Sequence, residues 1–185
     1  MKFTFSLPSK FCVVALVVVF VSFGNAAFAQ SGSTMQEEKV ASFHVGGSVE
    51  HPMSFSAADL KTMPRSKVKV YNAHEQKSEE YEGVALLEIL KRVGAPLGEK
   101  LRGPVLATYV IAEASDNYRV IFSLAELDQG FQDSEVLIAD TLNGAPLAEK
   151  QGPFKLVAPH DKRPARWIRM LQSIEVVTVP SKHSS

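Results

Sequence analysis

The residues best suited to chemistry lie in one basic segment near the C-terminus, GPFKLVAPHDKRPARWIRM (residues 152–170). Guanidinium and ammonium groups that converge with backbone N–H donors bind phosphate, sulfate or carboxylate. Pro159 and Pro164 would stiffen the loop that presents such groups. The same charges could instead point to water, and the residue types alone weigh the two interpretations equally. The basic or titratable side chains of the segment are Lys155, His160, Lys162, Arg163, Arg166 and Arg169.

Two aromatic residues bear on that choice. Trp167 lies between Arg166 and Arg169, and we expect it to pack inward as a strand begins. Alternation along that strand would place Trp167 and Arg169 on one face and Arg166 on the other. In SDNYRVIFS (residues 115–123), Tyr118 follows a turn and could face a cleft shared with the basic segment. The residue type favours a plainer interpretation, in which Tyr118 is a half-buried strand residue with its hydroxyl at the surface.

Familiar catalytic motifs are absent from the sequence. It contains no His-Glu-x-x-His pair, no Gly-x-Ser-x-Gly elbow and no phosphate-binding glycine loop. His44, His51 and His74 do not have the spacing of a metal site, and isolated histidines are more often surface or core residues. The sequence therefore predicts no metal site and identifies no catalytic residue.

The N-terminus reads as a secretory signal peptide, residues 1–29. Lys2 and Lys10 precede the apolar run FCVVALVVVFVSF, and the small-residue pattern Ala-Phe-Ala ends at Ala29. The alternative, an uncleaved membrane anchor, is less favoured because the run is shorter than the ~20 residues that span a bilayer. The charged region has no twin arginine, so we expect export in an unfolded state and a periplasmic location.

Cleavage at Ala29 would change both the charge and the chemistry of the chain. The formal net charge of zero becomes minus two once Lys2 and Lys10 are lost, which argues against a nucleic-acid partner. Cys12 is the only cysteine and leaves with the signal, so the mature chain has no disulfide and no thiolate ligand. We also expect no membrane span in the mature chain.

The elements that must position these residues suggest one α+β domain with a β-rich mixed sheet core and a few short helices. A flexible leader is predicted at 30–42, the domain at 43–179 and a tail at 180–185. Ser56 and Ser123 are predicted to cap two of the helices, as Ser-x-x-Asp and Ser-x-x-Glu sequences do. Helices do not alternate regularly with strands, which disfavours a doubly wound fold. Strands are predicted at 40–49, 67–73, 105–114, 118–123, 135–140, 154–159 and 174–179, and helices in 55–65, 83–94 and 123–126.

Two stretches resemble the molybdopterin-binding domain of the sulfite oxidase family. YEGVALLEILKRVG (81–94) is similar to that family's aromatic-x-Gly-Val-x-Leu-x-x-Leu-Leu segment. LIADTLNGAPLAEKQGPFKLVAPHDKRPARWIRMLQSIEV (137–176) resembles its Asn-Gly-x-Pro-Leu turn, following strand, basic-Trp strand and final Ile-x-Val. The resemblance covers roughly residues 40–178 and implies a mixed α+β domain around a β-rich core.

The resemblance also implies a site. In that family a pterin cofactor carries molybdenum, a cysteine thiolate binds the metal, and basic residues of the last strands hold the pterin phosphate. By position, Gln151 falls near an asparagine of that site, Lys155 on an arginine and Arg166 on a lysine. Tyr118 falls near the family's active-site tyrosine. The residues expected to bind an anion or a pterin phosphate are therefore Gln151, Lys155, Lys162, Arg163, Arg166 and Tyr118.

One departure from the family decides the expected chemistry. The metal-binding cysteine should lie around KVKVYNAHEQKS (67–78), which contains none. Histidine or tyrosine does not replace a thiolate in kind. Export in an unfolded state points the same way, because the family's enzymes acquire their cofactor while folding in the cytoplasm. We therefore expect no cofactor.

The sequence favours a binding module over an enzyme. The leading hypothesis is a periplasmic protein that binds a small anionic ligand or a protein partner through a retained basic corner. The alternative is a molybdopterin-dependent oxidoreductase that acts on a small oxo compound without the thiolate. A third possibility is an accessory protein whose basic segment binds a periplasmic or membrane protein.

Overall fold

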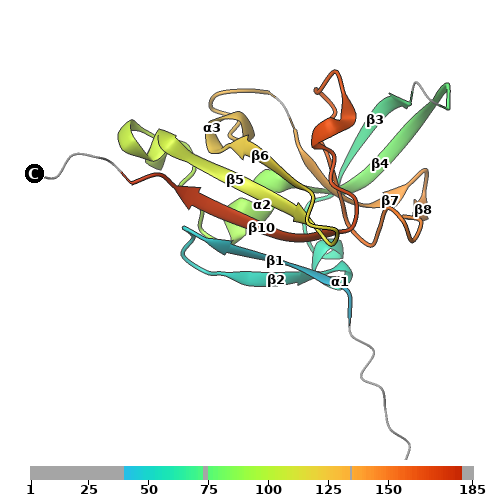
Figure 1. Cartoon of the computed structure of the whole chain (residues 1–185), viewed down its shortest axis with the longest axis horizontal. Helices are drawn as coiled ribbons and strands as arrows, with labels where there is room; N and C mark the ends of the chain where they lie inside the picture. Colours follow the sequence, from blue (N-terminus) through green and yellow to red (C-terminus); the bar gives the residue numbers. More distant parts are fainter. Residues whose placement is uncertain (1–39, 73–74, 134, 181–185) are drawn as a thin grey trace, which may run out of the picture. The chain divides into compact units, whose positions relative to one another are not determined.

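A computed structural model describes residues 40–72, 75–133 and 135–180. The predicted signal peptide, most of the predicted leader, and His74 lie outside the described residues. One five-stranded sheet has the order β2-β1-β10-β5-β6, and only its β1–β10 pair is parallel, so the sheet is mixed (Figure 1). Its strands are β1 (Ser42–Gly47), β2 (Met53–Ser56), β5 (Thr108–Ala114), β6 (Arg119–Ser123) and β10 (Leu171–Thr178).

A second sheet is antiparallel throughout and carries the N-terminal part of the basic segment. Its order is β3-β4-β7-β8, and β9 also pairs with β7, with Lys155 opposite Ala139. Its strands are β3 (Ser66–Asn72), β4 (Lys77–Ala85), β7 (Leu137–Leu142), β8 (Ala145–Pro146) and β9 (Lys155–Val157). Two sheets with few short helices confirm the predicted fold class.

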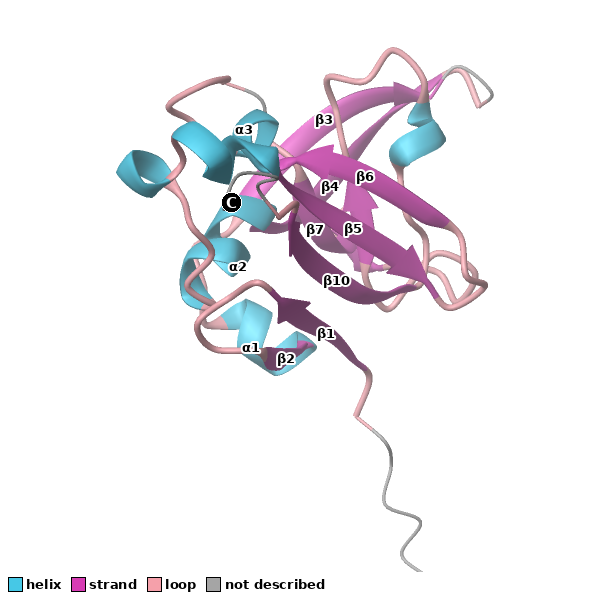
Figure 2. Ribbon diagram, turned by 60° about the vertical axis from the view of Figure 1, so that its left-hand side comes forward, coloured by secondary structure: helices cyan, strands magenta, loops and turns pink. Residues whose placement is uncertain are grey.

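The helices are short, and α1 and α3 begin where the sequence predicts. Ser56 caps α1 and Ser123 caps α3, each with a complete capping box, formed with Asp59 and Glu126 respectively. Within the described residues no helix is long and apolar enough to cross a membrane. The α-helices are α1 (Ala57–Lys61), α2 (Leu86–Arg92) and α3 (Leu124–Leu127), and the 3-10 turns are η1 (Gly98–Lys100), η2 (Gly103–Ala107) and η3 (Pro164–Arg166). The η3 turn lies beside the β3–β4 hairpin in two views (Figures 1 and 2).

Buried aromatic and aliphatic side chains hold the sheets and helices together. Phe43 of β1 stacks on Phe55 and meets Phe154 edge-on, with ring centroids 5.5 Å and 5.0 Å away. A smaller apolar cluster on the second sheet is built around Tyr81. Trp167 packs against both clusters and meets the Tyr81 ring edge-on at 5.8 Å. This packing fixes the basic segment on the domain, and Trp167 packs inward as the sequence predicts.

At Gly83 the paired strands β4 and β7 approach so closely that only glycine fits. The pairing register shifts between Glu82 and Gly83. A Cβ atom at Gly83 would lie 2.0 Å from the Ile138 carbonyl oxygen and 2.6 Å from the Ala139 Cα atom, so no side chain fits there. The glycine of the YEGV motif is therefore explained by a close approach of two backbones.

Several sequence predictions of local structure were wrong, among them the start of the strand predicted at 105–114, because Gly103–Ala107 is the 3-10 turn η2. The stretch Lys77–Ala85 is the strand β4, so the predicted helix at 83–94 begins only at Leu86. The short strand β2 was not predicted. Residues 164–166 form a 3-10 turn where a strand was expected from Arg166, because Pro164 at its first position favours a turn. Beyond that turn only Ile168 pairs, in an isolated bridge with Leu156.

Candidate functional site

The basic segment is a loop held at several points. The Trp167 indole N–H donates to the Ala158 carbonyl at 2.9 Å. On the other side, the Tyr118 hydroxyl donates to the Ala165 carbonyl at 2.5 Å. The backbones of Leu156 and Ile168 exchange two hydrogen bonds of 2.8 and 3.1 Å at the base of the loop. These bonds give the loop a defined position over the two sheets.

Lys155 lies beneath this loop and is almost fully buried, with 6% of its surface exposed. Its Nζ atom donates to the Tyr81 hydroxyl oxygen at 2.8 Å and to Gln151 Oε1 at 2.7 Å. The ammonium also lies 4.6 Å from the centre of the Tyr81 ring and 5.3 Å from that of Trp167. Aromatic faces stabilise a cation that has left water.

Tyr81 connects Lys155 to a buried carboxylate. Its hydroxyl donates to Glu79 Oε2 at 2.9 Å while it accepts the bond from Lys155. Asn72 Nδ2 donates to the other oxygen, Glu79 Oε1, at 2.9 Å. Burial and the neighbouring Glu79 raise the pKa of Tyr81 well above its usual value, so the phenol stays protonated. The Tyr81 hydroxyl therefore lies between the Lys155 ammonium and the Glu79 carboxylate, and Glu79 compensates the positive charge without direct contact.

Desolvation sets the protonation of Lys155. Burial lowers the pKa of Lys155 to about 8, the charge of Glu79 acts against this, and the charge of Arg169 adds to it. The side chain is therefore largely cationic at pH 7. An ammonium has three N–H donors, and the described residues accept only two of them.

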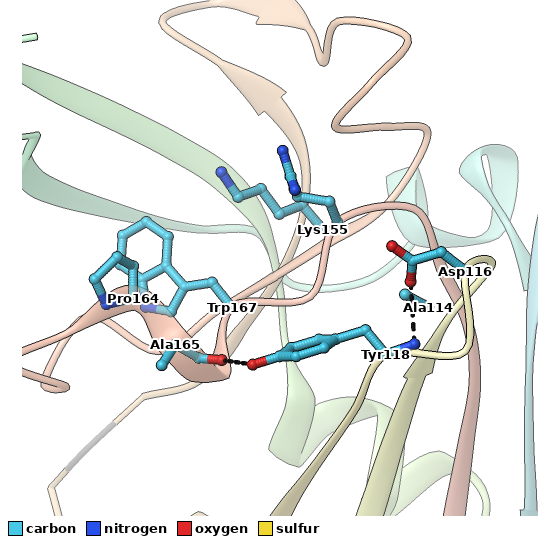
Figure 3. A pocket seen from close by; sticks show the side chains of 8 residues that line it. Ala114, Asp116, Tyr118, Lys155, Pro164, Ala165 and Trp167 are labelled. Atoms are coloured by element: carbon cyan, nitrogen blue, oxygen red, sulfur yellow. Dashed lines mark hydrogen bonds between the residues drawn. The ribbon is translucent and has the colours of Figure 1, made fainter. Parts of the chain in front are cut away.

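The third donor has a pocket beside it, which we call the Tyr118 pocket. Its volume is about 390 Å³. In the close view, Tyr118 crosses the pocket toward Ala165, with Lys155 on the opposite side (Figure 3). Arg169 contributes an exposed guanidinium, and no carboxylate of a described residue forms an ion pair with it. The lining residues are Ala114, Asp116, Tyr118, Lys155, Pro164, Ala165, Trp167 and Arg169.

Lys155 also borders a second cavity, the Tyr71 pocket, of about 500 Å³. Lys155, Pro164 and Trp167 belong to both pockets and separate them. The charges here are mixed, with three lysines and two carboxylates. Residues 69–72 form one wall, within the stretch (67–78) where the sequence resemblance predicts a cysteine. The charged and amide side chains of the lining are Lys69, Asn72, Glu79, Gln151, Lys155, Asp161 and Lys162.

The structure brings only some of the predicted site residues together. Lys155 and Tyr118 line the Tyr118 pocket, and Gln151, Lys155 and Lys162 line the Tyr71 pocket. Arg163 is exposed on the same loop and contributes to neither pocket.

Arg166 lies apart from these pockets and is bound by two carboxylates. Its Nε and Nη2 atoms donate to Asp161 at 2.8 and 2.6 Å, and Nη1 donates to Glu126 at 2.6 Å. The guanidinium also stacks over the Phe122 ring at 4.3 Å. These bonds raise the pKa of Arg166 further, and they occupy the donors that an anion would need. In this structure Arg166 ties the loop to α3.

Three residues of the site were not among the predicted site residues. Arg169 takes the place beside Lys155 that was expected for Arg166, and the predicted alternation already put Arg169 on the face of Trp167. Tyr81 was quoted only as the aromatic residue of a motif. Nothing in its residue type marked Glu79 as buried. Among the described residues, no group of three His, Cys, Asp or Glu side chains could hold a metal ion.

Comparisons with known proteins agree with this architecture. The sequence matches the family described as "Oxidoreductase molybdopterin binding domain" over residues 32–185. None of the curated proteins matches it. The fold is similar to the crystal structure of the sulfane dehydrogenase SoxCD from Paracoccus pantotrophus, with 20% identity and a TM-score of 0.58. That similarity covers 75% of this chain and 38% of the other, so this chain spans well under half of that protein's length.

Proposed function

Because the chain belongs to the oxidoreductase molybdopterin-binding domain family, as its two motifs predicted, we propose that it is a small-anion-binding member of that family. The observation that carries the proposal is the buried ammonium of Lys155. The described residues accept two of its three N–H donors, and the third lies beside a pocket that Lys155 shares with the exposed guanidinium of Arg169. Two cations in a partly desolvated pocket attract an anion more strongly than the same charges in water do.

The pocket favours a small ligand with a carboxylate, sulfate or phosphate group. Its volume of about 390 Å³ suits a metabolite of a few carbon atoms. Lys155 would donate one hydrogen bond and Arg169 two, and the Tyr118 and Trp167 rings would border the rest of the ligand. Asp116 accepts a bond from the Tyr118 backbone N–H at 3.0 Å, and its charge would repel anionic groups from that end.

The donor set does not fit molybdenum held by a protein thiolate. The Tyr71 pocket, where the family would place its cysteine, offers Lys69, Tyr71 and Asn72. The nearest carboxylate, Glu79, is already bonded to Asn72 and Tyr81. The carboxylates of Glu79 and Asp161, which line that pocket together with its lysines, would also repel a doubly charged pterin phosphate. We therefore propose that the protein acts without a molybdenum cofactor.

The alternative function is a molybdopterin-dependent oxidoreductase acting on a small oxo compound. Family membership favours it, as does the presence of Gln151, Lys155 and Lys162 along one pocket. Pterin fluorescence and metal analysis of protein purified from its native source distinguish the two functions. Molybdenum near one equivalent would support the enzyme, and less than about a tenth of an equivalent would support the cofactor-free binder.

We also propose that the protein acts in the periplasm. The support is the predicted signal peptide, whose lysines and apolar run precede a cleavage site at Ala29. Cell fractionation with N-terminal sequencing of the mature protein tests this. A mature chain that begins near Gln30 in the periplasmic fraction is the expected result, and an uncleaved chain in the cytoplasm would contradict it.

The binding proposal is tested with a panel of carboxylates, sulfate and phosphate by calorimetry and thermal shift. At least one anion should bind to the wild-type protein, and Lys155→Met and Arg169→Ala should each weaken it by tenfold or more. Arg163→Ala is the matched control, because it removes the same charge from the same loop outside the pocket. If no anion binds, or if all three variants lose affinity equally, the pocket is not an anion site. A pull-down from periplasmic extract tests the protein-partner possibility separately.

A further inference from the structure

Lys155 differs from every other lysine among the described residues. The others are exposed, and several pair with a glutamate, as Lys67, Lys91 and Lys100 do. Lys155 alone is buried, and none of the described carboxylates lies within ion-pair distance of it. An amine that is desolvated and close to another cation is held partly in its neutral, nucleophilic form. Burial lowers the pKa of Lys155 to about 8, with Arg169 acting in the same direction.

The groups around Nζ could donate and accept the protons that are transferred in a reaction at this amine. The Tyr81 hydroxyl lies 2.8 Å from Nζ and donates to Glu79, so it can pass a proton between the amine and that carboxylate. The amide oxygen of Gln151, 2.7 Å from Nζ, orients the nitrogen. The charged groups that line the two pockets around Lys155 are Glu79 on β4, Arg169 and Asp116 in the Tyr118 pocket, and Lys69, Asp161 and Lys162 in the Tyr71 pocket.

We propose that Lys155 captures an anionic carbonyl compound, of the 2-oxo acid class, as an imine in the Tyr118 pocket. The proposal rests on the anion-binding function and specifies its ligand. Arg169 would hold the carboxylate of the ligand, which places the adjacent ketone carbon at the amine. A preformed neutral amine and a fixed carboxylate are what such a reaction needs from a protein.

The chemistry balances without an oxidant or a reductant. The lone pair of Nζ forms a bond to the carbonyl carbon as the carbon–oxygen double bond becomes single, and one proton passes from the nitrogen to the oxygen to give a carbinolamine. The nitrogen then gives up its remaining proton, and the hydroxyl group leaves with a proton as water. The sum is one amine and one carbonyl compound giving one imine and one water. In the starting amine the Tyr81 hydroxyl accepts a hydrogen bond from the nitrogen, so it can take up a proton that the nitrogen gives up.

Reductive trapping tests the proposal directly. The full mature protein is incubated with pyruvate and cyanoborohydride at pH 8, and adducts are located by intact mass and peptide mapping. One adduct at Lys155 is expected, formed at least tenfold faster than on any exposed lysine, because far less of an ordinary amine is neutral at that pH. Lys155→Met should abolish it, and Lys150→Met, which removes an exposed lysine that lines neither pocket, should leave it unchanged. Adducts spread over exposed lysines, with the same total in the Lys155→Met variant, would overturn the proposal.

A second comparison separates this proposal from the function on which it rests. Lactate carries the same carboxylate as pyruvate but no carbonyl group. If both bind with dependence on Arg169 and pyruvate is not trapped, the anion site stands and imine formation is refuted. If pyruvate is trapped at Lys155 with a rate that rises from pH 7 to pH 8.5, the proposal is supported. A loss of folding in the Lys155→Met variant would show in circular dichroism, and Tyr81→Phe, which should slow trapping severalfold in a folded protein, then provides the test.

Discussion

Replacing Lys155 by methionine should change how stability depends on pH. The side chains have similar length, but methionine has no charge and no proton to lose. In the wild-type protein, burial lowers the pKa of Lys155 from 10.5 to about 8. Between these two values the unfolded chain binds more protons than the folded protein, so the free energy of unfolding rises with pH. The variant should lack this contribution.

The size of the effect follows from the two pKa values. From pH 7 to pH 10 the wild-type protein should gain about 2–3 kcal/mol of unfolding free energy relative to Lys155→Met. Above pH 10 the raised pKa of Tyr81 acts in the opposite sense, because the unfolded chain loses its phenolic proton first. The measurement therefore ends at pH 10.

Urea unfolding followed by tryptophan fluorescence is a suitable assay. Trp167 is the only tryptophan, and it packs against the Tyr81 ring beside Lys155. Both proteins are unfolded at pH 7, 8, 9 and 10, together with Lys162→Met as an exposed-lysine control. The control should track the wild-type protein at each pH. If the difference between wild type and Lys155→Met stays constant across this range, Lys155 is not held with a lowered pKa and the reasoning fails.

Three further substitutions test other parts of the structure. Arg166→Ala should destabilise the domain by about 2 kcal/mol in urea unfolding, through the loss of its charged hydrogen bonds, and weaken anion binding in calorimetry far less than Arg169→Ala does, because it only loosens the loop. Equal affinity loss in this variant and in Arg169→Ala would contradict the assignment. Gly83→Ala should cost about 3 kcal/mol or more, since its Cβ would lie 2.0 Å from the Ile138 carbonyl oxygen; a stability within 0.5 kcal/mol of wild type would refute the close approach of the strands. Tyr118→Phe should cost about 1 kcal/mol by losing one exposed hydrogen bond, and it should weaken anion binding severalfold by loosening the loop; unchanged binding would show that the bond does not shape the pocket.

Local sequence signals predicted the local structure well. The capping boxes at Ser56 and Ser123 involve residues three positions apart, and both helices begin where these residues predict. The strand β4 escaped prediction because KSEEYEGVA is mostly polar. Its buried polar residues find their partners only in the folded chain: Glu79 accepts from Asn72 of the neighbouring strand and from Tyr81, and Tyr81 accepts from Lys155, which is 74 positions away.

The candidate site shows the same limit. Lys155 was singled out from the sequence, but its burial depends on the hydroxyl of a residue 74 positions away. Arg166 and Arg169 are the same residue type, three positions apart, and their surroundings separate them. Arg166 forms ion pairs with Asp161 and Glu126, whereas Arg169 lines the Tyr118 pocket. Only tertiary contacts decide which guanidinium is neutralised and which can bind a ligand.

The pH dependence of anion affinity tests the central claim most directly. A carboxylate ligand from the panel, whose own charge is constant from pH 7 to pH 9.5, is titrated by calorimetry into wild-type protein and Lys155→Met. The wild-type affinity should fall by about tenfold over this range as Lys155 loses its proton, while the weaker affinity of the variant should stay level. A wild-type affinity that is constant from pH 7 to pH 9.5, or one that Lys155→Met does not lower, would contradict an anion site at Lys155.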